Sequence, residues 1–288
     1  MEGQLNPWKA VRSICVVLAA AAIVQGAERS VYFYDAKNIS EAAWHNQIRK
    51  WRSEGIRRAI VSVESGPAFL LEDAVEAPRL ARFFAEAASD GIHIEALILQ
   101  DPSWVLDPAG ARVRLRSVID FERRYKGSLD AVQIDVEVYT APKLFSPNEA
   151  WGRYGALLAA LRDELKQDGS RLRLNAALPW WLNTISPSEL GTIIQYLDGM
   201  LLMVYTGPGE TPVAVDLETF QKKVLPAIKP LENSGPILRI GIAKYEFTSQ
   251  QALEAFAGQV DLLLAEVPGF AGVSYFHETA NFVSAATP

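Results

Sequence analysis

The most specific chemical feature of this sequence is the alternation of polar and apolar residues between Asp130 and Glu137. Side chains two positions apart in a β-strand point to the same side, so Gln133, Asp135 and Glu137 would share one face of a strand. The residues between them are valine and isoleucine, which would share the opposite face. Two neighbouring carboxyl groups in a poorly solvated place raise the pKa of one of them, as a general acid near neutral pH requires. We therefore predict Glu137 as a general acid and Asp135 as its partner, against the alternative of a buried polar network that carries no chemistry.

The segments on either side of this alternation are of two kinds, which differ in composition and alternate along the chain. Short runs rich in Val, Ile, Leu and Tyr alternate with longer amphipathic stretches, as βα units do. The predicted strands are Ser30–Tyr34, Arg58–Val63, Ile92–Leu99, Ala131–Val136, Leu172–Leu178, Gly199–Val204, Leu238–Ile242 and Gly272–Phe276. The predicted helices are Glu41–Ser53, Ala77–Ser89, Ala111–Tyr125, Glu149–Gln167, Ser188–Tyr196, Leu217–Leu231 and Ser249–Glu266. Evenly spaced units without a glycine-rich phosphate loop favour a single closed (β/α)8 TIM barrel over residues 28–288, rather than an open doubly wound sheet.

Residues with special backbone preferences mark several helix ends. Ser40, Ser188 and Ser249 are predicted N-caps, because a serine hydroxyl can accept a hydrogen bond from a free backbone N–H in the first turn. Gly55 and Gly91 each stand between a predicted helix and the next strand, where glycine readily adopts the left-handed conformation that ends a helix. These positions support the predicted order of helices and strands.

A barrel of this kind carries its active site at the carboxyl ends of its strands, so the residues that close the strands are candidates for substrate contact. Carboxylates, amides and aromatic rings gather at these ends, and an aromatic ring at the mouth can stack on a sugar ring. The alternatives are packing under loops for the tryptophans, a turn before proline for Asp101 and a loop tether for His277. The predicted substrate-binding residues are Gln133, Tyr139, Asp101, Trp104, Trp180, Glu246 and His277.

Two short segments resemble motifs of family 18 glycoside hydrolases, the chitinase-like barrels. Asp130–Glu137, D-A-V-Q-I-D-V-E, is similar to the family signature D-x-x-D-x-D-x-E, and Met203–Tyr205 is similar to its M-x-Y on the sixth strand. Asn175–Pro179 and Gly272–Phe276 stand where the fifth and eighth strands of that family would lie. The segments Gln100–Trp104 and Asp135–Tyr139 also resemble uncharacterised secreted bacterial barrels.

The family resemblance implies a catalytic role for three residues. Glu137 would protonate the glycosidic oxygen, Asp135 would orient the N-acetyl group of the substrate, and Tyr205 would hydrogen-bond near that group. The N-acetyl group would serve as the nucleophile, an exception to the scheme with two protein carboxylates. This chain departs from the family at Gln133, which replaces an aspartate of the signature, and at Thr206, which replaces an aspartate that commonly follows the tyrosine.

Two other functions are compatible with the sequence. Glu246 follows the predicted seventh strand, and a pair of glutamates after strands four and seven is the arrangement of many retaining glycosidases. In that case Glu137 would be the acid and Glu246 the nucleophile. The replacements at Gln133 and Thr206 are equally compatible with a non-catalytic barrel that binds carbohydrate.

The N-terminal segment predicts export. Lys9 and Arg12 precede an apolar run from Ile14 to Val24 that suits a signal peptide, and residues 1–27 would leave after cleavage at Gly26 or Ala27,. An uncleaved membrane anchor is the alternative. We expect a secreted or periplasmic protein that does not contact the membrane after cleavage.

Charge and composition narrow the partners. The net charge of -6 argues against nucleic acid, so the expected partner is a polysaccharide or oligosaccharide,. The single cysteine, Cys15, would leave with the signal, which removes disulfides, cysteine nucleophiles and thiolate metal sites,. His45 and His93 lack metal-ligand spacing, so we expect neither a metal nor a cofactor.

Overall fold

The structure is a computed structural model that describes residues 27–37, 39–66, 68–206, 211–212, 216–231 and 235–276. The predicted signal peptide up to residue 26, with Cys15, lies outside the described residues, and so does His277. Among the described residues, no helix is long and apolar enough to span a bilayer.

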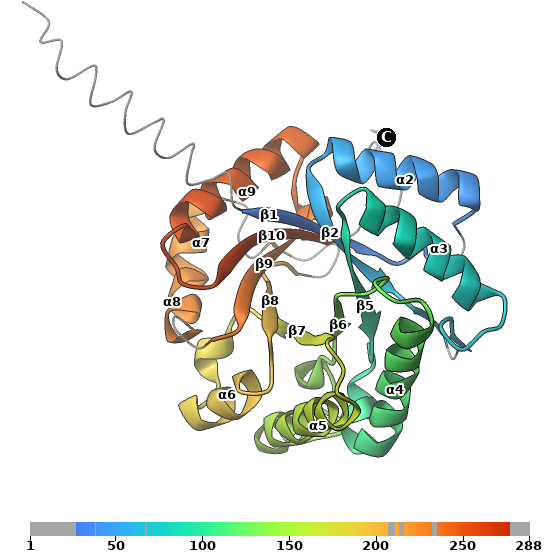
Figure 1. Cartoon of the computed structure of the whole chain (residues 1–288). Coiled ribbons are helices and arrows are strands. Elements are labelled where there is room, and N and C mark those ends of the chain that lie inside the picture. Colours follow the sequence, from blue (N-terminus) through green and yellow to red (C-terminus); the bar gives the residue numbers. More distant parts are fainter. Residues whose placement is uncertain are drawn as a thin grey trace, which may run out of the picture.

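Eight parallel strands close into a barrel, which confirms the predicted fold (Figure 1). Their order around the barrel is β1-β10-β9-β8-β7-β6-β5-β2. The strands are β1 (Glu28–Phe33), β2 (Ile56–Ser62), β5 (His93–Ile98), β6 (Ala131–Ile134), β7 (Arg173–Pro179), β8 (Gly199–Met203), β9 (Ile237–Ala243) and β10 (Phe270–Phe276). A small antiparallel hairpin, β3 (Glu64–Ser65) and β4 (Ala68–Phe69), follows β2.

The α-helices lie outside the barrel and connect successive strands, as Figure 1 shows. They are α2 (Glu41–Ser53), α3 (Glu76–Ser89), α4 (Pro108–Arg124), α5 (Pro147–Asp168), α6 (Pro187–Ile194), α7 (Leu217–Lys223), α8 (Leu225–Ile228) and α9 (Gln250–Leu264). Short 3₁₀ turns follow several strands: η1 (Pro102–Leu106), η2 (Val138–Thr140), η3 (Leu182–Thr184) and η5 (Lys244–Glu246).

Two predicted helices differ from the structure for identifiable reasons. The N-cap of α6 is Ser186 and not Ser188, because Pro187 takes the first helical position and the Ser186 hydroxyl accepts from the Glu189 N–H at 3.3 Å,. The single helix predicted over Leu217–Leu231 is broken into α7, α8 and the 3₁₀ turn η4 (Lys229–Leu231). Pro226 lies in the first turn of α8, where its missing N–H cannot continue the hydrogen bonds of α7,.

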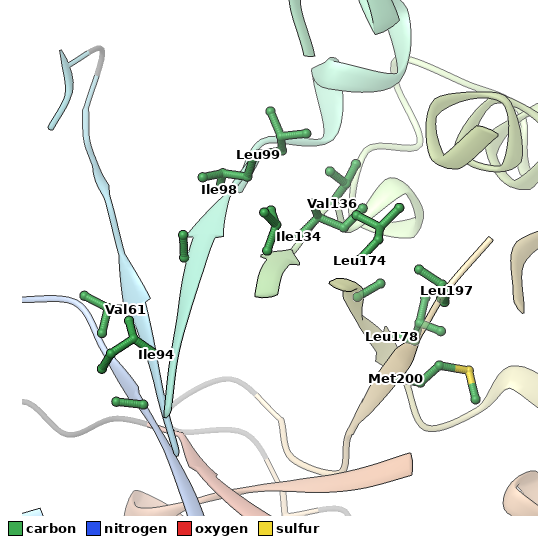
Figure 2. Close-up of a cluster of buried hydrophobic side chains, with 14 of the residues drawn as sticks. Val61, Ile94, Ile98, Leu99, Ile134, Val136, Leu174, Leu178, Leu197 and Met200 are labelled. Carbon is green, nitrogen blue, oxygen red and sulfur yellow. The ribbon is translucent and has the colours of Figure 1, made fainter. Parts of the chain in front are cut away.

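The main hydrophobic core lies between the outer faces of the strands and the helices. Figure 2 shows part of it, with Ile134 and Val136 of the β6 segment beside Leu174 of β7. Val132 is buried in the same core, so the apolar residues of the β6 segment face the helices as the alternation predicts. The alternate residues therefore face the inside of the barrel.

The inside of the barrel is layered. Near the amino ends of the strands, the Glu95 carboxylate contacts Arg58 at 3.0 Å and Arg239 at 3.2 Å, and all three side chains are buried. Above them lies an apolar layer, which closes the middle of the barrel: Tyr32, Ile60, Leu97, Ala177, Leu201 and Met203. Four aromatic rings pack on that layer: Tyr34, Tyr139, Tyr205 and Phe276. The polar groups at the mouth are thus separated from the ionic cluster at the base.

Gly272 allows the barrel to close between β10 and β1. It pairs with Glu28 at φ +135°, and a Cβ there would lie 2.0 Å from the Glu28 carbonyl oxygen. No other residue type fits so close to a neighbouring backbone, so a glycine is required at this position.

Candidate active site

Asp135 and Glu137 stand directly after β6, at the mouth of the barrel. Asp135 follows the last strand residue and Glu137 is the N-cap residue of η2. Burial, reinforced by the negative charge of Glu137, raises the pKa of Asp135 to about 7. Burial also raises the pKa of Glu137, against the effect of a hydrogen bond from Tyr139 that favours its carboxylate. Both carboxyl groups therefore favour the protonated form more than ordinary ones do, and the effect is large at Asp135.

Five tyrosines surround this acid pair. Burial raises the pKa of each hydroxyl, and the charge of Asp135 adds to the effect for all of them: Tyr32, Tyr34, Tyr139, Tyr154 and Tyr205. Tyr154 reaches the pair from α5, and Tyr32 comes from β1. The Asp135 Oδ1 atom and the hydroxyls of Tyr32 and Tyr154 are buried without a hydrogen-bond partner among the described residues. Such atoms need an explanation in a folded protein, and a polar substrate group would supply one.

Tyr205, which the sequence predicts as catalytic, lies in this ring of tyrosines. Its ring stacks on that of Phe276 with the centroids 4.6 Å apart. Phe276 also contacts the rings of Tyr32 and Tyr34 edge-on, at 5.7 and 5.9 Å. Phe276 thus holds three of the tyrosines in one packed group beside Asp135.

A second aromatic group stands on the β6–β7 side of the mouth. Tyr139 contacts Trp181 edge-on at 5.0 Å and stacks on Trp151 at 6.2 Å. The neighbouring Trp180, which the sequence predicts for substrate binding, is half-buried and packs against the main core. Trp181 therefore lies beside the predicted residue Tyr139, and Trp151 of α5 supports it from the helix layer.

Glu246 makes contacts with the loop after β8. Its Oε1 atom accepts from the Thr206 N–H at 2.9 Å and from the Thr206 hydroxyl at 3.2 Å. The Tyr245 hydroxyl donates to the Thr206 carbonyl in the same place. The burial and hydrogen bonding that shift the pKa of Glu137 include no contribution from Glu246. This arrangement ties two loops together and gives the retaining two-carboxylate scheme no direct support.

Gln133 lies below the acid pair on the inner face of β6. It is 1% exposed, and its Nε2 atom is 3.5 Å from the Ile134 carbonyl oxygen, which makes at most a long hydrogen bond. As a neutral side chain it gives Asp135 no charged neighbour from below. Among the described residues, Glu137 is the only carboxyl group that contributes to the raised pKa of Asp135.

A cleft of about 490 Å³ opens on the β1–β5 side of the mouth. It contains Asp101 and Trp104, both predicted for substrate binding. It also contains residues to which the sequence analysis gave no role: Tyr34, Ser62, Glu64, Gly66, Gln100, Ser103 and Arg114. Glu64 and Gln100 could have been predicted to line the mouth because they follow predicted strands. Arg114 lies in helix α4, and its position in the sequence gives no such indication.

The described residues contain no group of three or more His, Cys, Asp or Glu side chains arranged to hold a metal ion.

No family model matches this sequence, and no curated protein matches it. Solved structures match its fold. A GH18 chitinase from Pseudoalteromonas aurantia matches with a TM-score of 0.60 and 12% identity, over 87% of this chain and 94% of the chitinase. A GH5-4 broad specificity endoglucanase from an uncultured bacterium has a TM-score of 0.56 and 11% identity, over 92% and 91% of the two chains. A Bacteroides uniformis beta-glucuronidase has a TM-score of 0.56 and 12% identity, over 86% of this chain and 30% of that one. At such identities the similarity shows the barrel fold, which hosts many chemistries.

Proposed function

We propose that this protein is a secreted or periplasmic glycoside hydrolase that cleaves an amino-sugar-containing polysaccharide, with Glu137 as the general acid. The observation that carries the proposal is the half-buried pair Asp135 and Glu137 at the carboxyl end of the strands, where both pKa values are raised. A general acid is most effective when its pKa lies near the working pH. The resemblance of the β6 segment to family 18 and the fold shared with a GH18 chitinase agree with this proposal.

In the proposed reaction the carbonyl oxygen of the substrate's N-acetyl group attacks the anomeric carbon. The bond from that carbon to the glycosidic oxygen breaks, and the oxygen keeps the electron pair and takes the proton of Glu137. Water then opens the cyclic intermediate at the anomeric carbon and returns a proton to the Glu137 carboxylate. Tyr205 and Asp135 would hold the N-acetyl group in position for the attack.

Glu137 must be protonated when the glycosidic bond breaks. In the free protein, Asp135 has the pKa of about 7. A substrate N–H that donates to Asp135 would stabilise the carboxylate form of Asp135 and lower its pKa. Because the two groups are coupled, the proton would then be held by Glu137. Substrate binding itself would thus prepare the acid.

The test compares wild type with Glu137→Gln and Asp135→Asn for release of reducing ends from chitin, peptidoglycan and biofilm amino-sugar polymers. Both variants should lose activity, and Glu137→Gln should fall about 10²–10⁴-fold while it still binds glycan. Glu266→Gln, which changes an exposed glutamate after α9, is the matched control. Full activity of Glu137→Gln would remove the main support for the proposal.

Two further measurements identify the alternatives: the activity of Glu246→Gln in the same assay, and glycan binding by wild type and Glu137→Gln. Loss of activity in Glu246→Gln as large as in Glu137→Gln would favour the retaining scheme, since only that scheme uses Glu246 as a nucleophile. Equal glycan binding by wild type and Glu137→Gln without turnover by either would identify a non-catalytic carbohydrate-binding barrel.

A further inference from the structure

The cleft on the β1–β5 side has no part in the proposed bond cleavage, yet it adjoins the acid pair. Tyr34 lines the cleft, and its raised pKa is caused by burial and then by the charges of Asp135 and Glu137. The same side chain therefore faces both places. The volume of about 490 Å³ lies within the range of about 300–1,000 Å³ that is usual for small-molecule sites.

The walls of the cleft carry hydrogen-bonding groups held in fixed positions. The Gln100 Nε2 atom donates to the Ser62 hydroxyl at 2.9 Å. Gln100 follows Leu99, which is fully buried and has φ +55°, a left-handed conformation that is unfavourable for leucine,. Backbone strain of this kind persists where the surrounding structure demands it, and it is common beside ligand sites.

The cation of the cleft, Arg114, is already engaged. Its guanidinium carbon lies 4.3 Å from the centre of the Phe69 ring and 5.8 Å from that of Trp104. Its Nε atom is 3.8 Å from a carboxylate oxygen of Glu64, which offsets its charge. An anionic sugar would have to compete with Glu64 for Arg114.

The remaining charge in the cleft is negative. The Asp101 carboxylate accepts from the side chain of Ser103 and from its N–H, the latter at 2.8 Å, and these bonds hold the pKa of Asp101 below its usual value. Asp101 is exposed, and within the described part of the chain no lysine or arginine forms an ion pair with it. With Arg114 and Glu64 compensating each other, the cleft presents one carboxylate beside the half-buried ring of Trp104.

We propose that this cleft is a sugar-binding subsite for a hexosamine unit whose amino group is free and positively charged. The Trp104 ring would stack on the sugar, Asp101 would attract the ammonium group, and Gln100 would bond to a hydroxyl. The inference rests on the proposed function and narrows its substrate to a partially deacetylated amino-sugar polymer. The N-acetylated unit is cut at the acid pair, and the free amine is recognised in the cleft.

The test measures binding by calorimetry in the Glu137→Gln protein, in which we expect turnover of the probes to be strongly reduced. The probes are the β-1,4-linked tetramers of glucosamine and of N-acetylglucosamine. Asp101→Asn should weaken the glucosamine tetramer about fivefold and leave the acetylated tetramer unchanged. The difference between the tetramers should shrink as salt is added, because salt screens exposed charges. Trp104→Ala should weaken both.

Asp107→Asn is the matched control. Asp107 caps α4 through the Gly110 N–H at 2.9 Å, much as Asp101 caps η1, but it does not line the cleft. An asparagine can still accept the capping bond at either position, so only the charge is tested. Asp107→Asn should leave both affinities unchanged.

Failure of this inference can be told from failure of the proposed function. If wild type cleaves acetylated polymers while Asp101→Asn binds the glucosamine tetramer normally, the subsite proposal is wrong and the hydrolase stands. Absence of binding by the glucosamine tetramer, or an equal loss for both tetramers, overturns it too. If binding of the glucosamine tetramer depends on Asp101 and no polymer is cleaved, the subsite proposal is supported and the proposed hydrolase function is wrong.

Discussion

Tyr205, which follows β8, and Phe276 of β10 stack face to face with their ring planes 14° apart, although β9 lies between β8 and β10. The intervening strand, β9, presents Gly241 at this level. A Cβ on Gly241 would lie 3.4 Å from a ring carbon of Tyr205 and 2.7 Å from a methyl carbon of Leu201. The absent side chain of Gly241 therefore leaves room for Leu201, whereas a methyl group there would only touch the Tyr205 ring.

Gly241→Ala should reduce stability. The added methyl group overpacks the barrel against Leu201, so we expect a loss of about 1–3 kcal/mol in the free energy of unfolding. Denaturant unfolding measures this loss, and the rate of polymer cleavage should fall with it. The control is Gly258→Ala in α9, where a Cβ meets nothing within 4 Å. That change should be neutral or stabilising, and equal destabilisation by the two would contradict the packing explanation.

The raised pKa of Asp135 predicts how stability varies with pH. An ordinary aspartate titrates near 3.8, whereas Asp135 titrates near 7 in the folded protein. Between these values the folded protein holds a proton that the unfolded chain has released, so rising pH favours unfolding. Asp135→Asn removes this effect. The free energy of unfolding of Asp135→Asn should therefore rise relative to that of wild type between pH 4 and pH 7, by about 4 kcal/mol at most.

Denaturant unfolding of both proteins at several pH values measures the difference. Asp163→Asn, on the exposed side of α5, should follow wild type throughout. A constant difference between Asp135→Asn and wild type across this range would mean that Asp135 titrates like an ordinary aspartate.

Much of the fold could be predicted because its signals are local. The alternation in the β6 segment predicts which residues face the helices, and Val132 and Ile134 are buried there while Gln133 is inside the barrel. The alternation of short apolar runs with longer amphipathic stretches predicts the order of strands and helices. The break at Pro226 and the cap at Ser186 were missed because they depend on single residues at helix ends, where the surrounding pattern carries little information.

The surroundings of the acid pair were harder to predict. Tyr154 belongs to an amphipathic helix, and nothing local tells that its hydroxyl reaches toward Asp135 rather than resting in the core. Trp151 lies in a helix and packs against the main core, but its ring also supports Tyr139. Arg114 joins the cleft only because α4 lies beside the β3–β4 hairpin. Such contacts join residues far apart in sequence, and they follow from packing rather than from spacing.

The buried cluster at the base of the barrel should be essential for stability. Burial opposes ionisation of Glu95, but the guanidinium groups of Arg239 and Arg58 outweigh it and hold its pKa below the usual value. Glu95→Gln would remove the fully buried anion of the cluster and leave Arg58 and Arg239 with the partly buried Glu28 as their shared carboxylate. Breaking a buried ion pair typically costs about 3–5 kcal/mol in unfolding free energy. For comparison, Asp120→Asn breaks an exposed pair with Arg123, worth about 1 kcal/mol or less. A loss at Glu95 no larger than that would show that the cluster is solvated or dispensable.

The hydrogen bond between Tyr139 and Glu137 predicts a shift in the pH dependence of activity. Donation from the Tyr139 hydroxyl stabilises the Glu137 carboxylate and so counteracts the rise in its pKa caused by burial. Tyr139→Phe removes this donor and keeps the ring contacts with Trp181 and Trp151, so the pKa of Glu137 should rise further. A general acid works only when protonated, and activity is lost on the alkaline side as it ionises. The alkaline limb of the pH profile of kcat/KM should therefore move to higher pH in Tyr139→Phe. Tyr196→Phe, which changes a tyrosine far from the acid pair in sequence, is the control, and its alkaline limb should not move. A shift to lower pH would mean that Tyr139 favours the protonated acid, and no shift would mean that Glu137 does not set the alkaline limb.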